Sequence, residues 1–286
     1  MLIAATASFR TLASIDTQTL RTCFNEAFKQ YYVPLQLSAV QFQEKLWSEA
    51  IDLNLSFGVF INDRLAGFIL NGIDIIDNKK VAYNAGTGIL PEYRGGHLCY
   101  SLYEYCIERL QKAGVTRIVL EVIEQNAAAI KTYERLGFTV TRKLNSYKGR
   151  PTLTLPRPVK IETIPVVLWD VLQVKCEWKP SWQFSIRSIK RLQNKYTLQV
   201  AYCNDKWVAY CIGNFNTGRI AHFGCAEINN KQKYLAALFK EVNDAVPFNT
   251  LSIVNIDSNA FYSNTFLLSL GMQRYTTCSE MEMRLV

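Results

Sequence analysis

A turn between an apolar strand and a helix carries the residues of this sequence that best suit phosphate binding. Residues 86–102 run through Pro91 into a helix start that contains Arg94, Gly95 and Gly96. A helix N-terminus presents unpaired N–H groups and the positive end of a dipole, glycine lets a phosphate approach the main chain, and arginine supplies a fork of donors. A P-loop would need Gly-Lys-Ser/Thr here, and a Rossmann turn would start its helix directly after the strand. We therefore predict a diphosphate-binding cradle.

A second segment, residues 126–138, spaces its Asn, Ala, Tyr, Gly and Phe residues in a distinctive way. Together the two segments resemble the signature of the GCN5-related N-acetyltransferase superfamily. That signature is a strand ending near a proline, Arg/Gln-x-x-Gly-x-Gly/Ala at a helix start, another strand, and Asn-x-x-Ala-x-x-x-Tyr-x-x-x-Gly-Phe. The second part is matched at Asn126, Ala129, Tyr133, Gly137 and Phe138. The resemblance covers the whole first half of the chain.

The resemblance implies that the first half binds acetyl-CoA and passes the acetyl group to an amine by direct attack. It also implies that strand N–H groups hold the thioester where the strand ending at Leu90 parts from residues 120–123, an arrangement that suits a tetrahedral oxyanion. Composition alone fits ordinary core strands equally well. The predicted cofactor-binding residues are Ile89, Leu90, Arg94, Gly95, Gly96, His97, Leu98, Cys99, Tyr100 and Asn126. No metal ion is expected.

The sequence departs from the family pattern at the cradle, where family glycines fall at the positions of His97 and Cys99. We expect both residues to lie at a helix start with negative φ, where glycine serves close approach rather than backbone conformation. The main-chain N–H groups remain, so the cofactor is expected to bind with its diphosphate displaced outward.

Tyr133 is the predicted general acid, because a phenol of pKa ~10 can protonate a departing thiolate of similar basicity. The alternative is a core tyrosine, since Ala129, Ile130 and Leu136 share its helix face. Asn126 can bond the pantetheine arm, as the family implies, or cap the helix, and an amide can do both.

No general base is assigned. Glu121 lies on the strand beside the expected thioester, but it is equally a solvent-facing strand residue. His97 suits phosphate contact better than amine deprotonation. His97 and Cys99 are two apart on a helix, which disfavours a nucleophilic pair. His222 lies in an apolar strand and is interpreted as structural.

The elements that must position these residues follow from the local pattern. Asp16 and Ser38 are predicted helix caps, residues 55–61 and 65–73 form a hairpin around Asn62-Asp63, and residues 81–90 and 117–123 are further strands. The predicted fold is α/β (α+β), with two acetyltransferase-like domains, each a mixed, mostly antiparallel sheet flanked by helices. The domains are placed at 1–150 and 159–286, with a Pro-rich connection at 151–158.

The second half repeats the order of the first. Residues 204–210 match 62–68 in character, and 251–272 echo 118–138, which favours an internal duplication. No Arg-x-x-Gly cradle follows its third strand, near residues 218–228, and Leu267 stands where Tyr133 would align. We predict a degenerate copy that contributes packing or a wall of the substrate site.

Composition narrows the remaining alternatives. The chain has 286 residues, 49% of them hydrophobic, and eight cysteines without metal or disulfide spacing, which we interpret as reduced thiols in a cytoplasm. No signal peptide is expected at residues 1–10 and no membrane span elsewhere. The net charge is +8, with most of the excess after residue 148. We interpret the basic residues between Lys175 and Lys195 as a solvated helix face rather than a nucleic-acid surface.

The predicted function is therefore a cytoplasmic acetyl-CoA-dependent N-acetyltransferase acting on a small-molecule or peptide amine, with one working cleft. The alternative is a non-catalytic acyl-CoA-binding or regulatory module, and nucleic-acid binding ranks below both. A homodimer is a further possibility. The sequence does not identify the acceptor amine, because its pocket is expected in the early helices, near residues 24–47.

Overall fold

The computed structural model describes residues 7–33, 35–152, 159–172, 174–226, 229–247 and 250–285. The chain forms two compact units, Met1–Thr141 with Ser279–Val286, and Arg142–Cys278. The domains drawn from the sequence are consecutive stretches, whereas the first unit also contains the C-terminal segment. Most of the Pro-rich connection, residues 153–158, lies outside the described residues.

The first unit follows the predicted order of strand, two helices, three strands, helix, strand, helix and strand. Its elements are β1 (Ala7–Thr11), α1 (Thr17–Ala27), α2 (Ala39–Ser48), β2 (Phe57–Ile61), β3 (Arg64–Ile76), β4 (Lys79–Ile89), the 3-10 helix η1 (Pro91–Tyr93), α3 (Leu98–Lys112), β5 (Val115–Ile123), α4 (Ala127–Arg135) and the start of β6 (Thr139–Gly149). Strands β1 to β4 are antiparallel neighbours, and β5 runs parallel to β4.

Local signals in the sequence set the ends of these elements. Asp16 accepts a backbone N–H of the first turn of α1 at 2.8 Å. Ser38 and Gln41 form a reciprocal capping box at the start of α2. Asn62 and Asp63 adopt φ of +49° and +60°, the left-handed conformation that a two-residue hairpin turn requires. The predicted caps and hairpin are confirmed.

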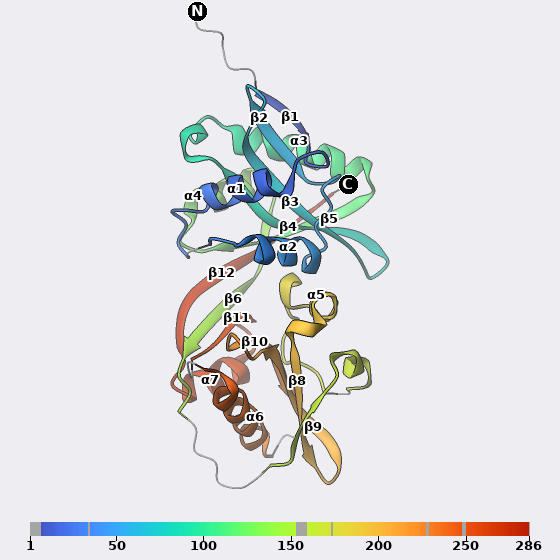
Figure 1. Cartoon of the computed structure of the whole chain (residues 1–286), viewed down its shortest axis with the longest axis vertical. Helices are drawn as coiled ribbons and strands as arrows, with labels where there is room; N and C mark the ends of the chain where they lie inside the picture. Colours follow the sequence, from blue (N-terminus) through green and yellow to red (C-terminus); the bar gives the residue numbers. More distant parts are fainter. Residues whose placement is uncertain are drawn as a thin grey trace, which may run out of the picture. The chain divides into compact units, whose positions relative to one another are not determined.

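Helices cover both faces of the sheet in the first unit (Figure 1). On one face α3 and α4 pack on an apolar cluster that includes Leu102 and Leu110. On the other face Phe24 of α1 contacts Phe42 and Phe68, with ring centroids 5.6 Å apart in each pair. Because both faces are buried, β3 is a nearly continuous run of buried residues instead of an alternating one.

The second unit begins with different elements and then repeats the order of strands and helices seen in the first unit. It contains the rest of β6, then β7 (Ile161–Ile164), η2 (Val166–Val171), η3 (Trp182–Phe184), α5 (Ile186–Arg191), η4 (Gln193–Lys195), β8 (Thr197–Cys203), β9 (Lys206–Asn214), β10 (Arg219–Cys225), α6 (Lys231–Ala245), β11 (Leu251–Asp257), α7 (Phe261–Ser269) and the first half of β12 (Gln273–Arg284). Helices α3 and α6 both have 15 residues, and α4 and α7 both have 9. The equal lengths agree with the predicted duplication.

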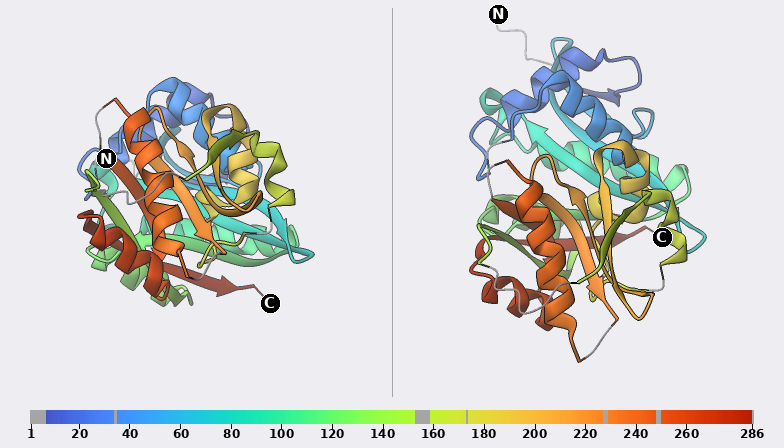
Figure 2. Two further views of the ribbon diagram at one scale, coloured as in Figure 1. Left: turned by 90° about the horizontal axis from the view of Figure 1, so that it is seen from below. Right: turned by 60° about the horizontal axis from the view of Figure 1, so that its bottom comes forward.

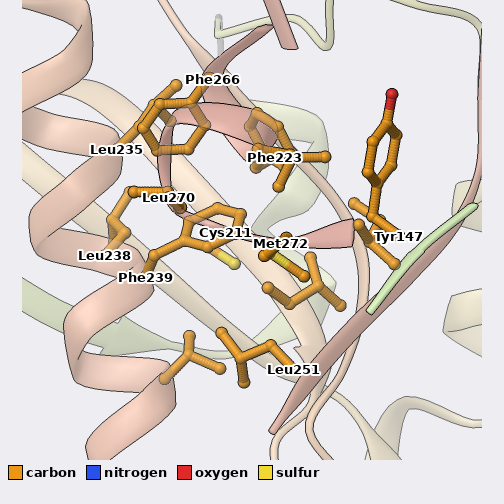
Figure 3. Packing of buried hydrophobic residues seen from close by; sticks show 14 of the residues in the cluster. Tyr147, Cys211, Phe223, Leu235, Leu238, Phe239, Leu251, Phe266, Leu270 and Met272 are labelled. Atoms are coloured by element: carbon orange, nitrogen blue, oxygen red, sulfur yellow. The ribbon is translucent and has the colours of Figure 1, made fainter. Parts of the chain in front are cut away.

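The core of the second unit lies between its sheet and the helices α6 and α7. Figure 2 shows α6 lying along the strands of this unit. Leu235, Leu238 and Phe239 project from α6 toward the sheet and α7 (Figure 3), and Phe239 meets Phe266 at 5.3 Å and Phe223 at 5.1 Å. A second cluster, which includes Tyr210 and Ile212, covers the opposite face.

The sheet of each unit includes a strand that is far in sequence from the strand next to it. In the first unit the end of β12 lies next to β5, where Arg117 and Glu282 form an ion pair at 3.1 Å and Met281 is fully buried. In the second unit the end of β6 pairs antiparallel with β11, from Leu144 to Gly149. The first unit is therefore built from two separate stretches of the chain, and the second from one.

Within the described residues no helix combines the length and the hydropathy that crossing a membrane would need. The same residues contain no group of three or more His, Cys, Asp or Glu side chains placed to bind a metal. None of the eight cysteines, all of which are described, forms a disulfide bond.

Candidate active site

The candidate site lies where β4 and β5 separate. Their parallel ladder runs from Lys80 opposite Val115 to Asn84 opposite Leu120 and ends there, although β4 continues to Ile89. An extra residue in β4 bulges just beyond the last pair, which bends a strand away from its neighbour. The strands thus part at the place that the sequence predicted for the thioester.

A short loop with two left-handed residues connects β4 to α3. Gly95 has φ +83° and His97 has φ +58°, and α3 begins at Leu98. The expectation of negative φ at His97 is wrong, because the chain must reverse between η1 and α3 and uses both residues to do so. Cys99 is helical, as expected. A glycine would suit position 97 conformationally, and histidine there costs about 1 kcal/mol.

The start of α3 keeps its main-chain donors available. His97 is the N-cap residue, and its side chain makes no capping hydrogen bond. A Cβ at Gly96 would meet no atom within 4 Å, so the loop beside it is open. These are the properties of a helix N-terminus that receives an anion.

A cavity of about 320 Å³ opens at this loop, between η1, α3 and α4. Seven of the ten predicted cofactor-binding residues line it: Ile89, Arg94, Gly95, His97, Leu98, Cys99 and Tyr100. Leu90, Gly96 and Asn126 do not. Four lining residues were missed from the sequence: Tyr93, Ala128, Thr132 and Arg135. The spacing of the last three on one face of α4 was the signal that could have found them.

Arg94 and Arg135 bring positive charge to this cavity. The guanidinium of Arg94 donates to the carbonyl of Ile89 at 3.0 Å and to that of Ala27 at 2.7 Å. It therefore ties the loop to the end of α1 and still carries its charge at an exposed position. Arg135 adds a second cation from α4. An anionic ligand would be attracted here.

Tyr133 lies beside the inner end of this cavity and is not part of its lining. Its ring packs on Tyr103 and Phe138, with centroids 5.6 and 5.7 Å away. Burial raises the pKa of Tyr133, the nearby Cys99 raises it further, and hydrogen bonding from Tyr103 lowers it. Burial also raises the pKa of the Cys99 thiol, to about 11. The ring is thus half-buried and packs against the apolar core of the first unit.

The other two candidates on β5 and α4 occupy the expected places. Asn126 caps α4, and its side-chain oxygen accepts the Ala129 N–H at 3.2 Å; a contact with the cofactor stays a prediction. Glu121 is half-buried on β5 and projects from the face opposite the buried Leu120 and Val122. It remains unassigned between a base and a strand residue.

In the second unit the corresponding opening is filled by the chain itself. Cys176 forms an antiparallel bridge with Gly224 of β10, whose other edge already pairs with Tyr210 of β9. The bridge therefore uses the edge of β10 that faces β11. Trp178 continues into the core, and the carboxylate of Glu177 accepts N–H groups at the start of α7. These contacts occupy the place that the first unit leaves open. That the second unit has no working site stays a prediction.

His222 is structural, as interpreted from the sequence. It is buried, its Nδ1 lies 3.1 Å from the hydroxyl of Tyr210, and burial lowers its pKa to about 3. The predicted third strand of this half is β10, and residues 227–228 of the prediction lie outside the described residues.

The first unit is similar in sequence to known proteins. The model of the acetyltransferase (GNAT) family matches residues 18–138. The [ribosomal protein bS18]-alanine N-acetyltransferase of Escherichia coli K12 is 30% identical over 139 residues, which are 48% of this chain and 86% of that protein. N-alpha-acetyltransferase 30 of Schizosaccharomyces pombe is 33% identical over 93 residues, 32% of this chain and 62% of that protein.

A solved structure extends the likeness to both units. A tandem GNAT protein from the clavulanic acid biosynthesis pathway, at 12% identity, has a TM-score of 0.68 and covers 98% of this chain and 99% of its own. At this identity the likeness concerns the fold alone, and the predicted fold class is confirmed. The chain belongs to the acetyltransferase (GNAT) family and is an acyltransferase with the tandem form of that fold.

Proposed function

We propose that the first unit transfers an acetyl group from acetyl-CoA to a primary amine, and that the acceptor is the α-amino group of a peptide or protein N-terminus. The observation that supports this most directly is the coincidence of three features: the parted strands, the open helix start at Gly96 and Leu98, and the cavity lined by Ile89 of β4 and by residues of α3 and α4. The two relatives, by their names, acetylate α-amino groups.

The residues present fit a CoA thioester. The N–H groups at the start of α3, with Arg94 and Arg135, suit its phosphates, and the open edge of β4 suits its acyl arm. In the proposed reaction the amine nitrogen attacks the thioester carbonyl, the C–S bond breaks, and Tyr133 gives its hydroxyl proton to the departing sulfur. The proton lost by the amine leaves through a base or water. Strand N–H groups stabilise the oxyanion.

Calorimetry and a thiol-release assay test this proposal on the full chain. We expect acetyl-CoA to bind with micromolar affinity and peptides with free N-termini to release thiol, whereas N-acetylated copies of the same peptides do not. Small amines form the comparison panel. Binding of acetyl-CoA without turnover on any amine would instead support a non-catalytic acyl-CoA-binding module, and no binding would contradict both functions.

A further inference from the structure

Three polar side chains form a cluster next to Tyr133: Asn84 and Tyr103 are buried, and Thr87 is half-buried. Asn84 Nδ2 donates to Thr87 Oγ1 at 2.7 Å and to the hydroxyl of Tyr103. The hydroxyls of Thr87 and Tyr103 are 2.9 Å apart. The amide oxygen of Asn84 accepts the Gly86 N–H at 2.9 Å, which fixes the direction of the amide. Tyr103 is fully buried and Asn84 is 7% exposed.

The number of protons in this cluster leaves one donor for Tyr133. Asn84 uses both amide protons on the two hydroxyl oxygens, and the bond between Thr87 and Tyr103 uses one of the two hydroxyl protons. One hydroxyl proton therefore remains. The rings of Tyr103 and Tyr133 meet edge to face. The hydroxyls of Tyr103 and Thr87 lower the pKa of Tyr133, because a hydroxyl donor favours the ionised form of a phenol.

The second unit shows the same framework without this cluster. A one-residue bulge follows the last parallel pair in both units, at Ala85 in β4 and at Ala221 in β10. Taking the two bulged residues as equivalent gives a residue-by-residue alignment of β4 with β10. The glycines that end α4 and α7, Gly137 and Gly271, both have positive φ and align the helices.

The aligned positions in the second unit are apolar. Ile220, Phe223 and Leu267 stand in place of the asparagine, the threonine and the α4 tyrosine, and each is at most 1% exposed. The fold therefore closes equally well around side chains that need no hydrogen bonds. Polar groups are costly to bury unless every one is bonded. The polar cluster occurs at these positions in the first unit and not in the second. Its presence is therefore not explained by a requirement of the fold.

The geometry points to a supporting role in the reaction: Thr87 and Tyr103, oriented by Asn84, are positioning residues that hold the hydroxyl of Tyr133 and stabilise its phenolate. This inference rests on the proposed function. When the O–H bond of Tyr133 breaks and the S–H bond of CoA forms, the phenolate receives the spare hydroxyl donor. The proton that the amine loses restores the phenol through water.

The other groups that face Tyr133 make such support necessary. Cys99 of α3 and Tyr31, which follows α1, both raise the pKa of Tyr133, and burial raises it most. No cation is among the groups that shift this pKa. A half-buried phenol without a nearby positive charge is a weak acid, so donated hydrogen bonds are the means by which the cluster strengthens it.

The decisive experiment replaces one hydroxyl without changing the shape of the side chain. Thr87→Val in the full chain should lower kcat for thiol release about tenfold, the loss expected for one hydrogen bond to a charged group, and leave KM for acetyl-CoA within twofold. Thr87→Ser, which restores the hydroxyl, should recover most of the rate. Tyr105→Phe is the matched control on α3, because its ring contacts Phe9 and Phe57 outside the cluster.

A double-mutant cycle separates this role from a merely structural one. In a Tyr133→Phe background, Thr87→Val should change kcat less than twofold, because no phenolate remains to stabilise. An equal loss in both backgrounds, or no loss in the single variant, would overturn the inference while leaving the proposed function intact. Tyr103→Phe provides a second test of the same prediction, with calorimetry of acetyl-CoA binding to show that each variant is folded.

A wild-type chain that neither binds acetyl-CoA nor releases thiol would overturn the proposed function, and this inference with it.

Discussion

The two units share one strand arrangement, which leads to a cavity in the first unit and is filled by the chain in the second. In each, a parallel ladder ends just before a bulge, and the two strands part. In the first unit the opening leads to a cavity with an open helix start and two arginines. In the second unit residues 174–178 fill the opening, with Cys176 bridged to Gly224. The same strand arrangement therefore accommodates either an open cavity or a packed core, depending on which residues lie between the parted strands.

The chemistry of the side chains around each opening follows the same division. The first unit places hydroxyl and amide groups around Tyr133, and the second places aliphatic and aromatic groups around Leu267. The second unit also uses the N-terminus of α7 to bind its own Glu177. In the second unit, contacts within the chain itself thus stabilise the region that the first unit leaves open.

The largest effect is expected from Tyr133→Phe. Loss of the proton donor should lower kcat about 100-fold, within the range of general acid catalysis, and leave the affinity for acetyl-CoA nearly unchanged because the ring stays in place. Thiol release at saturating substrate measures the first quantity and calorimetry the second. Tyr275→Phe, at a side chain that is 46% exposed, is the control in the second unit. Unchanged turnover would remove Tyr133 from the mechanism.

Gly224→Ala tests the packing of residues 174–178 between the parted strands of the second unit. A Cβ at this position would collide with the carbonyl of Lys175 and lie 2.7 Å from the ring of Tyr210. We expect the free energy of unfolding to fall by about 2 kcal/mol through overpacking, measured by chemical denaturation. Thiol release per folded molecule should not change, because the second unit has no part in the proposed chemistry.

Gly96→Ala is the matched control for that variant, since a Cβ there meets nothing within 4 Å and the stability should stay the same. A drop in turnover of Gly224→Ala under conditions where the chain remains folded would show that the second unit does contribute to catalysis.

Much of this arrangement was readable from the sequence. Periodicity, the caps at Asp16 and Ser38 and the Asn-Asp turns predicted the elements because each depends on contacts within a few residues. The cradle and the α4 segment were found in the same way. Their predicted contacts with the cofactor remain predictions.

The features that the sequence did not reveal depend on distant parts of the chain. The pairing of β6 with β11, the inclusion of the end of β12 in the first unit, and the bridge from Cys176 to Gly224 join residues far apart in sequence. The left-handed conformation of His97 follows from how η1 and α3 must meet, which a pattern of residue types does not record. The cluster of Asn84, Thr87 and Tyr103 needs the register of β4 against α3.

His222 offers a pH test of the second unit. Its folded pKa is lowered to about 3 by burial, so the folded chain holds it neutral while the unfolded chain protonates it near pH ~6.5. The stability that it contributes is complete above pH ~6.5 and is lost as the pH falls toward 3, by about 1 kcal/mol per pH unit. Denaturation of His222→Gln across this range should show a shallower dependence on pH. An identical slope would mean that His222 is protonated in the folded state.

The smallest effects come from the starts of the two equivalent helices. Glu177→Gln weakens the carboxylate that accepts the N–H groups of Tyr262 and Ser263 at 3.1 and 2.8 Å, and Asn126→Ala removes the cap of α4. Each should lower the free energy of unfolding by about 1 kcal/mol. Only Asn126→Ala should also raise KM for acetyl-CoA, because the start of α4 lies at the open cleft and that of α7 is closed by its own chain. Equal KM values in both variants would reduce Asn126 to a capping residue.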